Sequence, residues 1–215
     1  MAFTLNHLEF LLIGTLWTIC LATIGFIGGG LVGLCIALMR VSRSRMMRWS
    51  AAGYVQLVQG IPLPVLMFLS YFGLAITGTD VPALAAAAVS MTIFAGAYLG
   101  EIWRGSIEAV ARTQWEAADS LGLSAIQRMY DVILPQAVRI AIPPTVGYMM
   151  QIVKDSSYSV VIGFIELTQS GKIINNAIFE PFVVFTIVGA IYFCLCSPLS
   201  RASQRLDAGL RARGA

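Results

Sequence analysis

The sequence predicts an all-α integral membrane protein with five transmembrane helices. Hydrophobic residues make up 58% of the 215 residues, charged residues make up only 12%, and the mean hydropathy is +0.80. An average soluble domain has about 25% charged residues, so a soluble fold is excluded. The apolar residues lie in long unbroken runs and do not alternate with polar ones, which favours helices over a β-barrel. We therefore expect a single transmembrane domain that occupies residues 1–215.

The first two predicted spans cover residues 10–39 and 51–76. The first contains Gly28-Gly29-Gly30, but no strand precedes these glycines and no lysine follows them, so close helix packing explains them better than a phosphate loop. The second span is broken by Gly60 and Pro62. Such a break frees backbone groups that lipid cannot satisfy, so it should face protein or a water-filled path. A simple kink is the alternative.

The other three predicted spans cover residues 83–103, 140–164 and 182–199. The fourth span of the five is interrupted by Lys154 and Asp155. Ionisable residues inside a membrane are costly and usually functional, so both are candidates for a solute pathway. The alternative is a structural role at a helix end in the water interface.

The distribution of charge predicts the orientation of the chain. Twelve of the fourteen cations are arginines, and they form three clusters that flank predicted spans. Topology anchors have this placement, whereas nucleic-acid binding does not require it. Because cytoplasmic loops carry the excess of Lys and Arg, we expect all three clusters and the C-terminus in the cytoplasm, with the N-terminus outside. The residues Asp80, Glu166, Lys172 and Glu180 then lie outside. The clusters are Arg40, Arg43, Arg45 and Arg48; Arg104, Arg112, Arg128 and Arg139; and Arg201, Arg205, Arg211 and Arg213.

A polar insert over residues 112–135 separates the third and fourth spans. Thr113 and Glu116 have the spacing of a capping box that would start a helix. Trp115, Ala118 and Leu121 follow at three-residue spacing, which predicts one apolar face on that helix.

The second half of the insert carries a turn and a second helix start. Gly122 is placed to end the first helix in a left-handed conformation. Ser124 and Gln127 form a second capping signature, and Pro135 opposes continuation of the second helix. The prediction is a helix, a glycine turn, a second helix and a stop.

The exposed residues of the first helix suit a protein partner. Glu116 and Asp119 place negative charge on it, and the small side chains of Ala117 and Ala118 would let another surface approach its backbone. A helix that lies on the membrane surface is the alternative, but such a helix carries Lys and Arg on its polar face.

Several motifs together resemble a known family. Glu116-Ala117-Ala118, Gly122 and Ile133-Leu134-Pro135 resemble the cytoplasmic coupling loop of ATP-binding-cassette importer permeases. The segments 98–105, 114–118, 133–137 and 154–157 are similar to the polar amino-acid uptake subfamily, and the similarity covers nearly the whole chain. One departure is Gln59, where members of the family often have arginine before the Gly-x-Pro break.

The resemblance implies a bacterial inner-membrane assembly. Two permease subunits, identical or related, would form a pore, two separate ATP-binding subunits would drive it, and an external binding protein would deliver the amino acid. The contact with the ATPase would comprise Glu116, Ala117, Ala118, Asp119 and Gly122.

The chain itself is not expected to be an enzyme. It lacks the Gly-x4-Gly-Lys-Ser/Thr phosphate loop, so ATP and Mg²⁺ should bind to the partner ATPase and no cofactor to this chain. The four cysteines lie in apolar runs without metal-ligand spacing to the single His7, which predicts no metal site.

The resemblance also places the Lys154-Asp155-Ser156 segment and Glu101 near the amino-acid pathway. Asp155 or Glu101 could bind the substrate ammonium group. Lys154, or N–H groups freed at the Gly60–Pro62 break, could bind its carboxylate. For Glu101 a structural role at the membrane boundary is the alternative, and Tyr98 and Tyr158 are expected to serve packing.

The competing functions are less well supported by the sequence. A stand-alone secondary carrier or channel for small polar solutes needs no docking hairpin and usually shows inverted repeats, which are not evident here. An intramembrane enzyme would need a catalytic constellation such as Gly-x-Ser-x-Gly, and the chain has none. The sequence does not indicate which amino acid is carried or whether the second permease is an identical chain.

Overall fold

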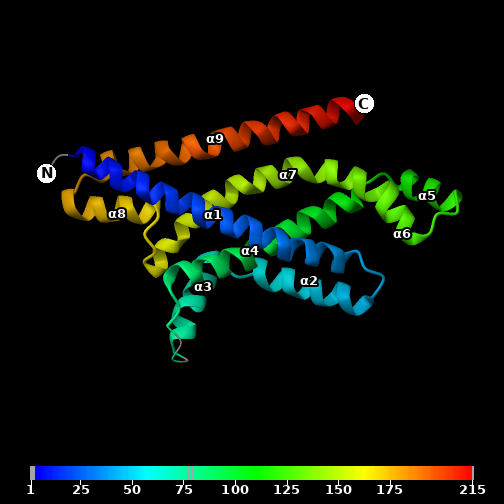
Figure 1. The fold of residues 1–215 in the computed structure, drawn as a ribbon, viewed down its shortest axis with the longest axis horizontal. Helices are drawn as coiled ribbons and strands as arrows, with labels where there is room; N and C mark the ends of the chain where they lie inside the picture. Colours follow the sequence, from blue (N-terminus) through cyan, green and yellow to red (C-terminus); the bar gives the residue numbers. More distant parts are fainter. Residues whose placement is uncertain (1–2, 77, 79, 215) are drawn as a thin grey trace.

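The computed structural model describes residues 3–76, 78 and 80–214, and in these residues every regular element is helical. The prediction of an all-α fold is therefore confirmed. Figure 1 shows most helices running along the long axis of the molecule. The α-helices are α1 (Leu5–Arg40), α2 (Arg45–Gln59), α3 (Leu63–Phe68), α4 (Ala83–Glu108), α5 (Arg112–Ser120), α6 (Ala125–Gln127), α7 (Leu134–Asp155), α8 (Leu167–Ile178) and α9 (Pro181–Gly214). Two π-helical segments, Leu69–Gly73 and Arg128–Ile133, and one 3₁₀ segment, Ser156–Ile162, complete the set.

The number of membrane spans differs from the prediction. Among the described residues, three helices are long and apolar enough to cross a membrane, namely α1, α4 and α9, and α2 with α3 makes a fourth if the bent pair is one span. The predicted span 140–164 is not among them, so by length and composition the structure supports at most four of the five predicted apolar spans. Its helix α7 includes polar residues such as Arg139 and Gln151, and it ends at Asp155, where the 3₁₀ segment begins.

The glycines of the first span pack against α4. A Cβ atom at Gly29 would lie 2.5 Å from the Cβ of Ala95, and one at Gly28 would lie 2.6 Å from Oγ1 of Thr92. Only residues without a side chain allow α1 and α4 to approach this closely, so the prediction of close helix packing is confirmed for these two glycines.

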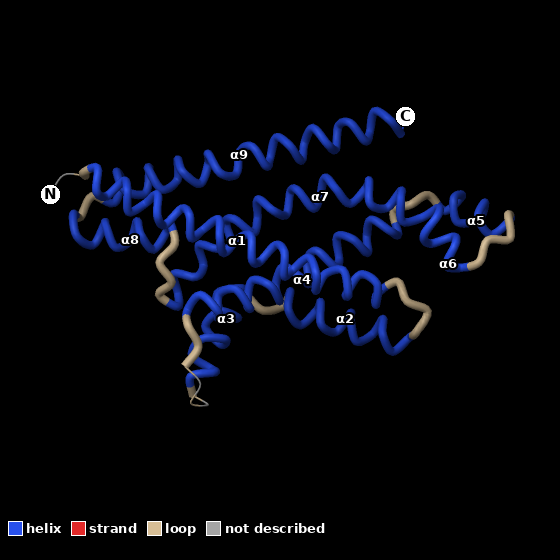
Figure 2. Tube along the Cα trace, viewed as in Figure 1, coloured by secondary structure: helices blue, strands red, loops and turns tan. Residues whose placement is uncertain are grey.

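The second span is broken, as predicted. The chain bends by 96° between α2 and α3. Gly60 ends α2 and Pro62 begins α3, with the turn between them visible as a loop in Figure 2. This angle is far larger than a simple kink, so α3 leaves the direction of the bundle.

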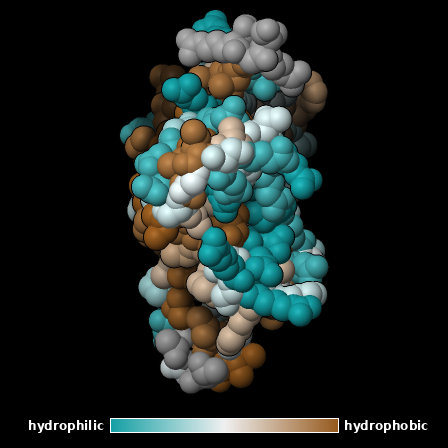
Figure 3. Space-filling model, turned by 90° about the vertical axis from the view of Figure 1, so that its right-hand side faces the viewer, coloured by the Kyte–Doolittle hydropathy of each residue, from teal (hydrophilic) through white to brown (hydrophobic). Residues whose placement is uncertain are grey.

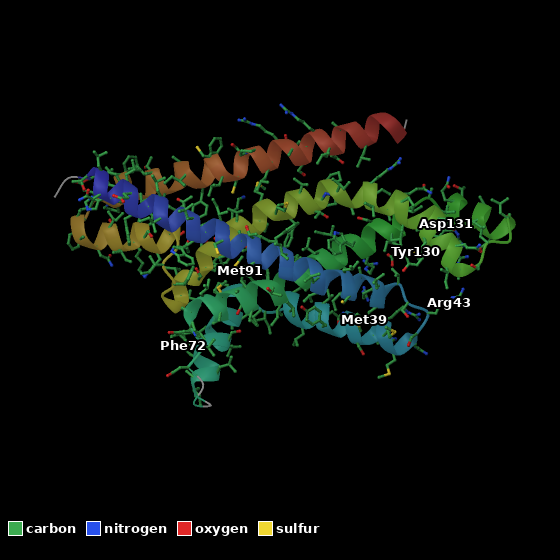
Figure 4. The ribbon with its side chains drawn as sticks, viewed as in Figure 1. Met39, Arg43, Phe72, Met91, Tyr130 and Asp131 are labelled. Atoms are coloured by element: carbon green, nitrogen blue, oxygen red, sulfur yellow. The ribbon has the colours of Figure 1, made fainter. Side chains whose placement is uncertain are left out.

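Three chain segments that carry the arginine clusters point toward the same end of the molecule. The loop between α1 and α2, the α5–α6 hairpin and the end of α9 lie toward this end, while the N-terminus and α8 lie at the opposite end (Figure 1). Arg43 of the loop and Tyr130 beyond α6 line a common depression there, and both are labelled in Figure 4. Viewed end-on, hydrophilic residues cover much of this face (Figure 3). The arrangement agrees with the predicted clustering, whereas the side of the membrane stays a prediction.

Candidate functional site

The first candidate site is the polar hairpin formed by α5 and α6. Helix α5 begins at Arg112, and its N-cap is Ala111, which makes no side-chain capping bond. The predicted cap at Thr113 was therefore wrong, because the helix starts one residue before it. Glu116 does not close a capping box; its carboxylate lies 3.4 Å from the Nε atom of Arg112.

The turn of the hairpin follows the sequence prediction closely. Gly122 has a φ angle of 71°, a conformation that strongly favours glycine. The Leu123 N–H donates to the Ala118 carbonyl at 3.2 Å and the Gly122 N–H donates to the Asp119 carbonyl at 3.0 Å, so the end of α5 is a Schellman motif. The capping box of Ser124 and Gln127 is also present, with bonds of 3.0 and 3.3 Å.

The predicted stop at Pro135 is absent. The chain continues from α6 through the π-helical segment Arg128–Ile133 directly into α7. Pro135 lies in the first turn of α7, directly after the π-helical segment, and the chain passes through it without leaving the helical conformation. As a consequence, the second arm of the hairpin and α7 form one continuous stretch of helix.

Only part of the predicted partner-binding surface of α5 is exposed to solvent. Ala118 is 2% exposed, whereas Leu121 is 78% exposed and does not join an apolar face. Glu116, Ala117 and Asp119 are exposed. Of the two alanines, Ala117 is therefore available to a partner, whereas Ala118 packs on the buried side of the helix.

Charged and aromatic contacts lock the two halves of the hairpin together. The Asp119 carboxylate forms an ion pair with the guanidinium of Arg128, across the turn. The same guanidinium lies 5.6 Å from the ring centroid of Trp115, and the Trp115 indole N–H donates to the Val110 carbonyl at 3.3 Å. The exposed acid Asp119 is thus held in place by a residue from the other arm.

A buried apolar cluster fixes the hairpin to the bundle. Ile107 at the end of α4 and Val110 in the connection to α5 pack with Ile133 and Ala137, and Trp115 and Val41 cover them. This anchor cluster joins the hairpin to the ends of α1 and α4 and to the start of α7. A force on the hairpin therefore acts on three long helices at once.

The second candidate site is a cavity of about 440 Å³ near the other end of α7. Asp155 is 4% exposed, and its carboxylate accepts a bond from Gln151 Nε2 at 2.8 Å. The rings of Tyr98 and Tyr148 stack at 5.5 Å, and the Tyr148 hydroxyl is buried without a hydrogen-bond partner. The cavity is lined by Pro62, Leu63, Pro64, Phe94, Tyr98, Tyr148, Gln151, Asp155 and Tyr158.

The structure thus brings two predicted pathway residues together, Asp155 and Pro62. Lys154 does not line this cavity; it lines a separate one between α7 and α9, with Tyr192 and Arg201. Successive residues of a helix point about 100° apart, which explains the separation of Lys154 from Asp155.

The remaining predicted pathway residues make other contacts. The Glu101 carboxylate lies 3.6 Å from Arg40 and also pairs with Arg104, so it is already neutralised. Ser156 is buried, and its hydroxyl donates to the Val153 carbonyl at 2.8 Å. Gly60 is exposed at the end of α2 and is not part of the cavity lining.

Sequence reasoning missed most of the cavity wall. Tyr98 and Tyr158 were assigned to packing, and Tyr148 and Gln151 were not singled out. A signal was present, because Tyr148, Gln151 and Asp155 have the three- and four-residue spacing of one helix face.

Glu166 has a role that the sequence did not indicate. It was predicted to lie on the outer side of the membrane, which stays a prediction, and its side chain is completely buried within the protein. Its carboxylate accepts bonds from Thr18 at 3.1 Å, from Tyr192 at 2.8 Å and from the Gln169 N–H at 2.9 Å. These bonds join α1, α8 and α9.

Comparison with known proteins gives consistent matches over nearly the whole chain. Residues 29–212 match the sequence profile of the family described as binding-protein-dependent transport system inner membrane component. The probable amino-acid ABC transporter permease protein YckA of Bacillus subtilis is 36% identical over 181 residues, which are 84% of this chain and 80% of that protein. A probable amino-acid ABC transporter permease of Sinorhizobium fredii is 34% identical over 214 residues, 100% of this chain and 93% of that protein.

Solved structures share the fold. A chain in a crystal structure of an amino acid ABC transporter with histidines has a TM-score of 0.91 and 32% identity, with 97% of this chain and 99% of that chain covered. A chain of the MetNI methionine ABC transporter, in an inward-facing conformation, has a TM-score of 0.81 at 20% identity, with 96% and 99% covered. At that identity the second likeness shows the fold alone.

Proposed function

Because this chain belongs to the family of binding-protein-dependent transport system inner membrane components, we propose that it moves an amino acid through the membrane when a separate ATPase acts on the α5–α6 hairpin. It is a multi-pass transport component of the inner membrane, and its relatives are permease subunits of amino-acid ABC transporters. The alternative of a stand-alone carrier would leave the hairpin without a use.

The observation that carries the proposal is the continuity of α7. This helix of 22 residues runs from the hairpin to the Asp155 cavity. At about 1.5 Å per residue it spans about 33 Å, roughly the thickness of the hydrocarbon core. A shift of the hairpin is therefore transmitted along one element to a wall of the cavity.

The ATPase contact that we propose consists of Glu116, Ala117 and Asp119 on the exposed face of α5, with Gly122 at the turn and Ala118 behind it. Two ATP-binding subunits, each acting on one of two permease subunits, would carry ATP and Mg²⁺, because this chain has no phosphate loop. An external binding protein would load the amino acid from the end that bears α8.

The substrate site that we propose is the Asp155 cavity. An anionic Asp155 would bind the substrate ammonium group, and the unpartnered Tyr148 hydroxyl could form a further hydrogen bond. The break at Pro62 forms another part of the wall, and backbone N–H groups near it are our candidates for the carboxylate. Lys154 and Glu101, which lie outside this cavity, would contribute elsewhere along the pathway.

The test is transport by the complex reconstituted in liposomes. Glu116→Lys and Gly122→Pro should abolish ATP-dependent amino-acid uptake and leave membrane insertion intact. Asp80→Lys is the matched control, since it reverses an exposed acid in the α3–α4 connection, away from the hairpin. Normal ATP-dependent uptake by both hairpin variants would refute the coupling role. Uptake by the chain alone, without ATP or partner, would favour the carrier.

A further inference from the structure

An apolar groove of about 450 Å³ lies between α1, α4 and α7. Leu34 and Leu38 of α1 and Trp103 of α4 form one side, and Ile142, Val146 and Met149 of α7 lie along the other. The polar groups in it are satisfied, because the Trp103 indole N–H donates to the Thr145 hydroxyl at 3.0 Å and that hydroxyl donates to the Ala141 carbonyl at 2.7 Å. The groove therefore offers an occupant almost only hydrocarbon contact.

One charged residue lies at the edge of the α7 face that lines this groove, although it is not itself part of the lining. Arg139 precedes Ile142 by three residues and Val146 by seven, so the three side chains form one row on α7. Arg139 is exposed, and in the described part of the chain it takes part in no ion pair. An unpaired guanidinium beside an apolar groove is suited to a ligand with an anionic head and an apolar tail.

The length of the groove fits the depth of one leaflet. From Arg139 to Met149 the helix rises ten residues, or about 15 Å at 1.5 Å per residue. Half of the hydrocarbon core of a bilayer is also about 15 Å. Arg139 lies toward the hairpin end of α7, where a lipid phosphate group of that leaflet would be, and Met149 lies toward the bilayer centre.

A second copy of this chain is a weaker candidate for the groove. It would have to bring a carboxylate to Arg139 from one of its own apolar helices. The acids within α4 and α7 are already bonded, Glu101 and Glu108 to Arg104 and Asp155 to Gln151. A phosphate group needs no such partner, and guanidinium binds phosphate through two parallel hydrogen bonds.

We propose that this groove binds an anionic phospholipid, with one acyl chain along Ile142, Val146 and Met149 and the phosphate on Arg139. Basic pockets between membrane helices are known to bind anionic lipid head groups. The lipid would fill the space between α1 and α7 next to the anchor cluster, since Ile107 and Ala137 belong to both. The site does not depend on which solute the protein carries.

Native mass spectrometry of the purified complex tests this site. The complex is exchanged into micelles that contain either palmitoyl-oleoyl phosphatidylglycerol or palmitoyl-oleoyl phosphatidylcholine. We expect one phosphatidylglycerol per chain to be retained, and Arg139→Gln to weaken its retention about tenfold, as the loss of a charge-assisted contact would. Arg205→Gln, at an exposed arginine of α9, is the control and should retain the lipid.

Two further variants keep the test decisive if Arg139→Gln is poorly folded. Arg139→Lys should keep most of the binding because it keeps the charge, and Ala141→Phe should reduce it because the ring would occupy the groove. Equal retention of phosphatidylglycerol by wild type and Arg139→Gln would overturn the proposal. So would equal retention of phosphatidylcholine and phosphatidylglycerol by the wild type, or efficient cross-linking of the Val146→Cys variant to a second copy through the new cysteine.

Discussion

Truncation of Ile133 should separate ATP hydrolysis from transport. This side chain is completely buried in the anchor cluster, at the junction of the hairpin and α7. Ile133→Ala removes three carbon atoms and leaves a cavity between Ile107 of α4, Val110 just beyond α4, and the start of α7. A buried Ile→Ala change costs about 2–5 kcal/mol, which is enough to loosen the hairpin from the long helices without removing any exposed residue of α5.

The measurement is the ratio of amino acid imported to ATP hydrolysed, in liposomes that contain the complete complex. We expect Ile133→Ala to keep ATP hydrolysis and to lower this ratio by about tenfold or more, since 1.4 kcal/mol of lost coupling free energy already corresponds to a factor of ten. Ile126→Ala is the matched control, because Ile126 lies on the same hairpin but is 71% exposed. If the ratio were unchanged while the thermal stability fell, the anchor cluster would be structural only.

Three other substitutions test the cavity and the packing. Asp155→Asn should reduce substrate-stimulated transport by at least about tenfold, the loss expected of one charge-assisted bond, with expression unchanged; unaltered transport would exclude Asp155 from the site. Gly29→Ala should destabilise the protein by about 1–3 kcal/mol in a thermal melt, because the new Cβ would lie 2.5 Å from the Cβ of an alanine in α4. The control Gly53→Ala, at a position with open space around it, should be neutral or stabilising. Glu166→Ala should lower the melting temperature far more than Glu9→Ala, because about 1–3 kcal/mol is lost for each buried donor left unpaired; similar melting temperatures would contradict that network.

The turn of the hairpin could be predicted from the sequence because it depends on interactions between residues that are close in the chain. Gly122 and the pair Ser124 and Gln127 fix the turn through backbone geometry and short-range hydrogen bonds, and the structure has both. The start of α5 was misplaced because Thr113 satisfies the capping pattern, although the helix has already begun at Arg112. The stop at Pro135 failed because the chain passes from the π-helical segment Arg128–Ile133 through this proline into α7, which no short sequence pattern indicates.

The cavity was only partly predictable because its wall is assembled from distant segments. Asp155 and the Pro62 break each stand out in an apolar sequence, and the fold brings them to one cavity. Tyr98 reaches it from α4 through stacking on Tyr148, a contact that no local pattern encodes. The burial of Glu166 was unpredictable for the same reason, because its partners Thr18 and Tyr192 are far away in the sequence.

Helix α7 needs lateral support to transmit movement over its whole length. Pro143 and Pro144 lie inside it and lack the N–H groups that would bond to the carbonyls one turn earlier, so its middle is weaker than an ordinary helix. The Ser203 hydroxyl of α9 donates to the Pro143 carbonyl at 2.8 Å, and α9 packs along α7. A shift of the hairpin would therefore move α7 and α9 together. The shape of the cavity between these two helices, which Lys154 lines, would then change less than the shape of the Asp155 cavity, because other walls of the Asp155 cavity belong to α3 and α4.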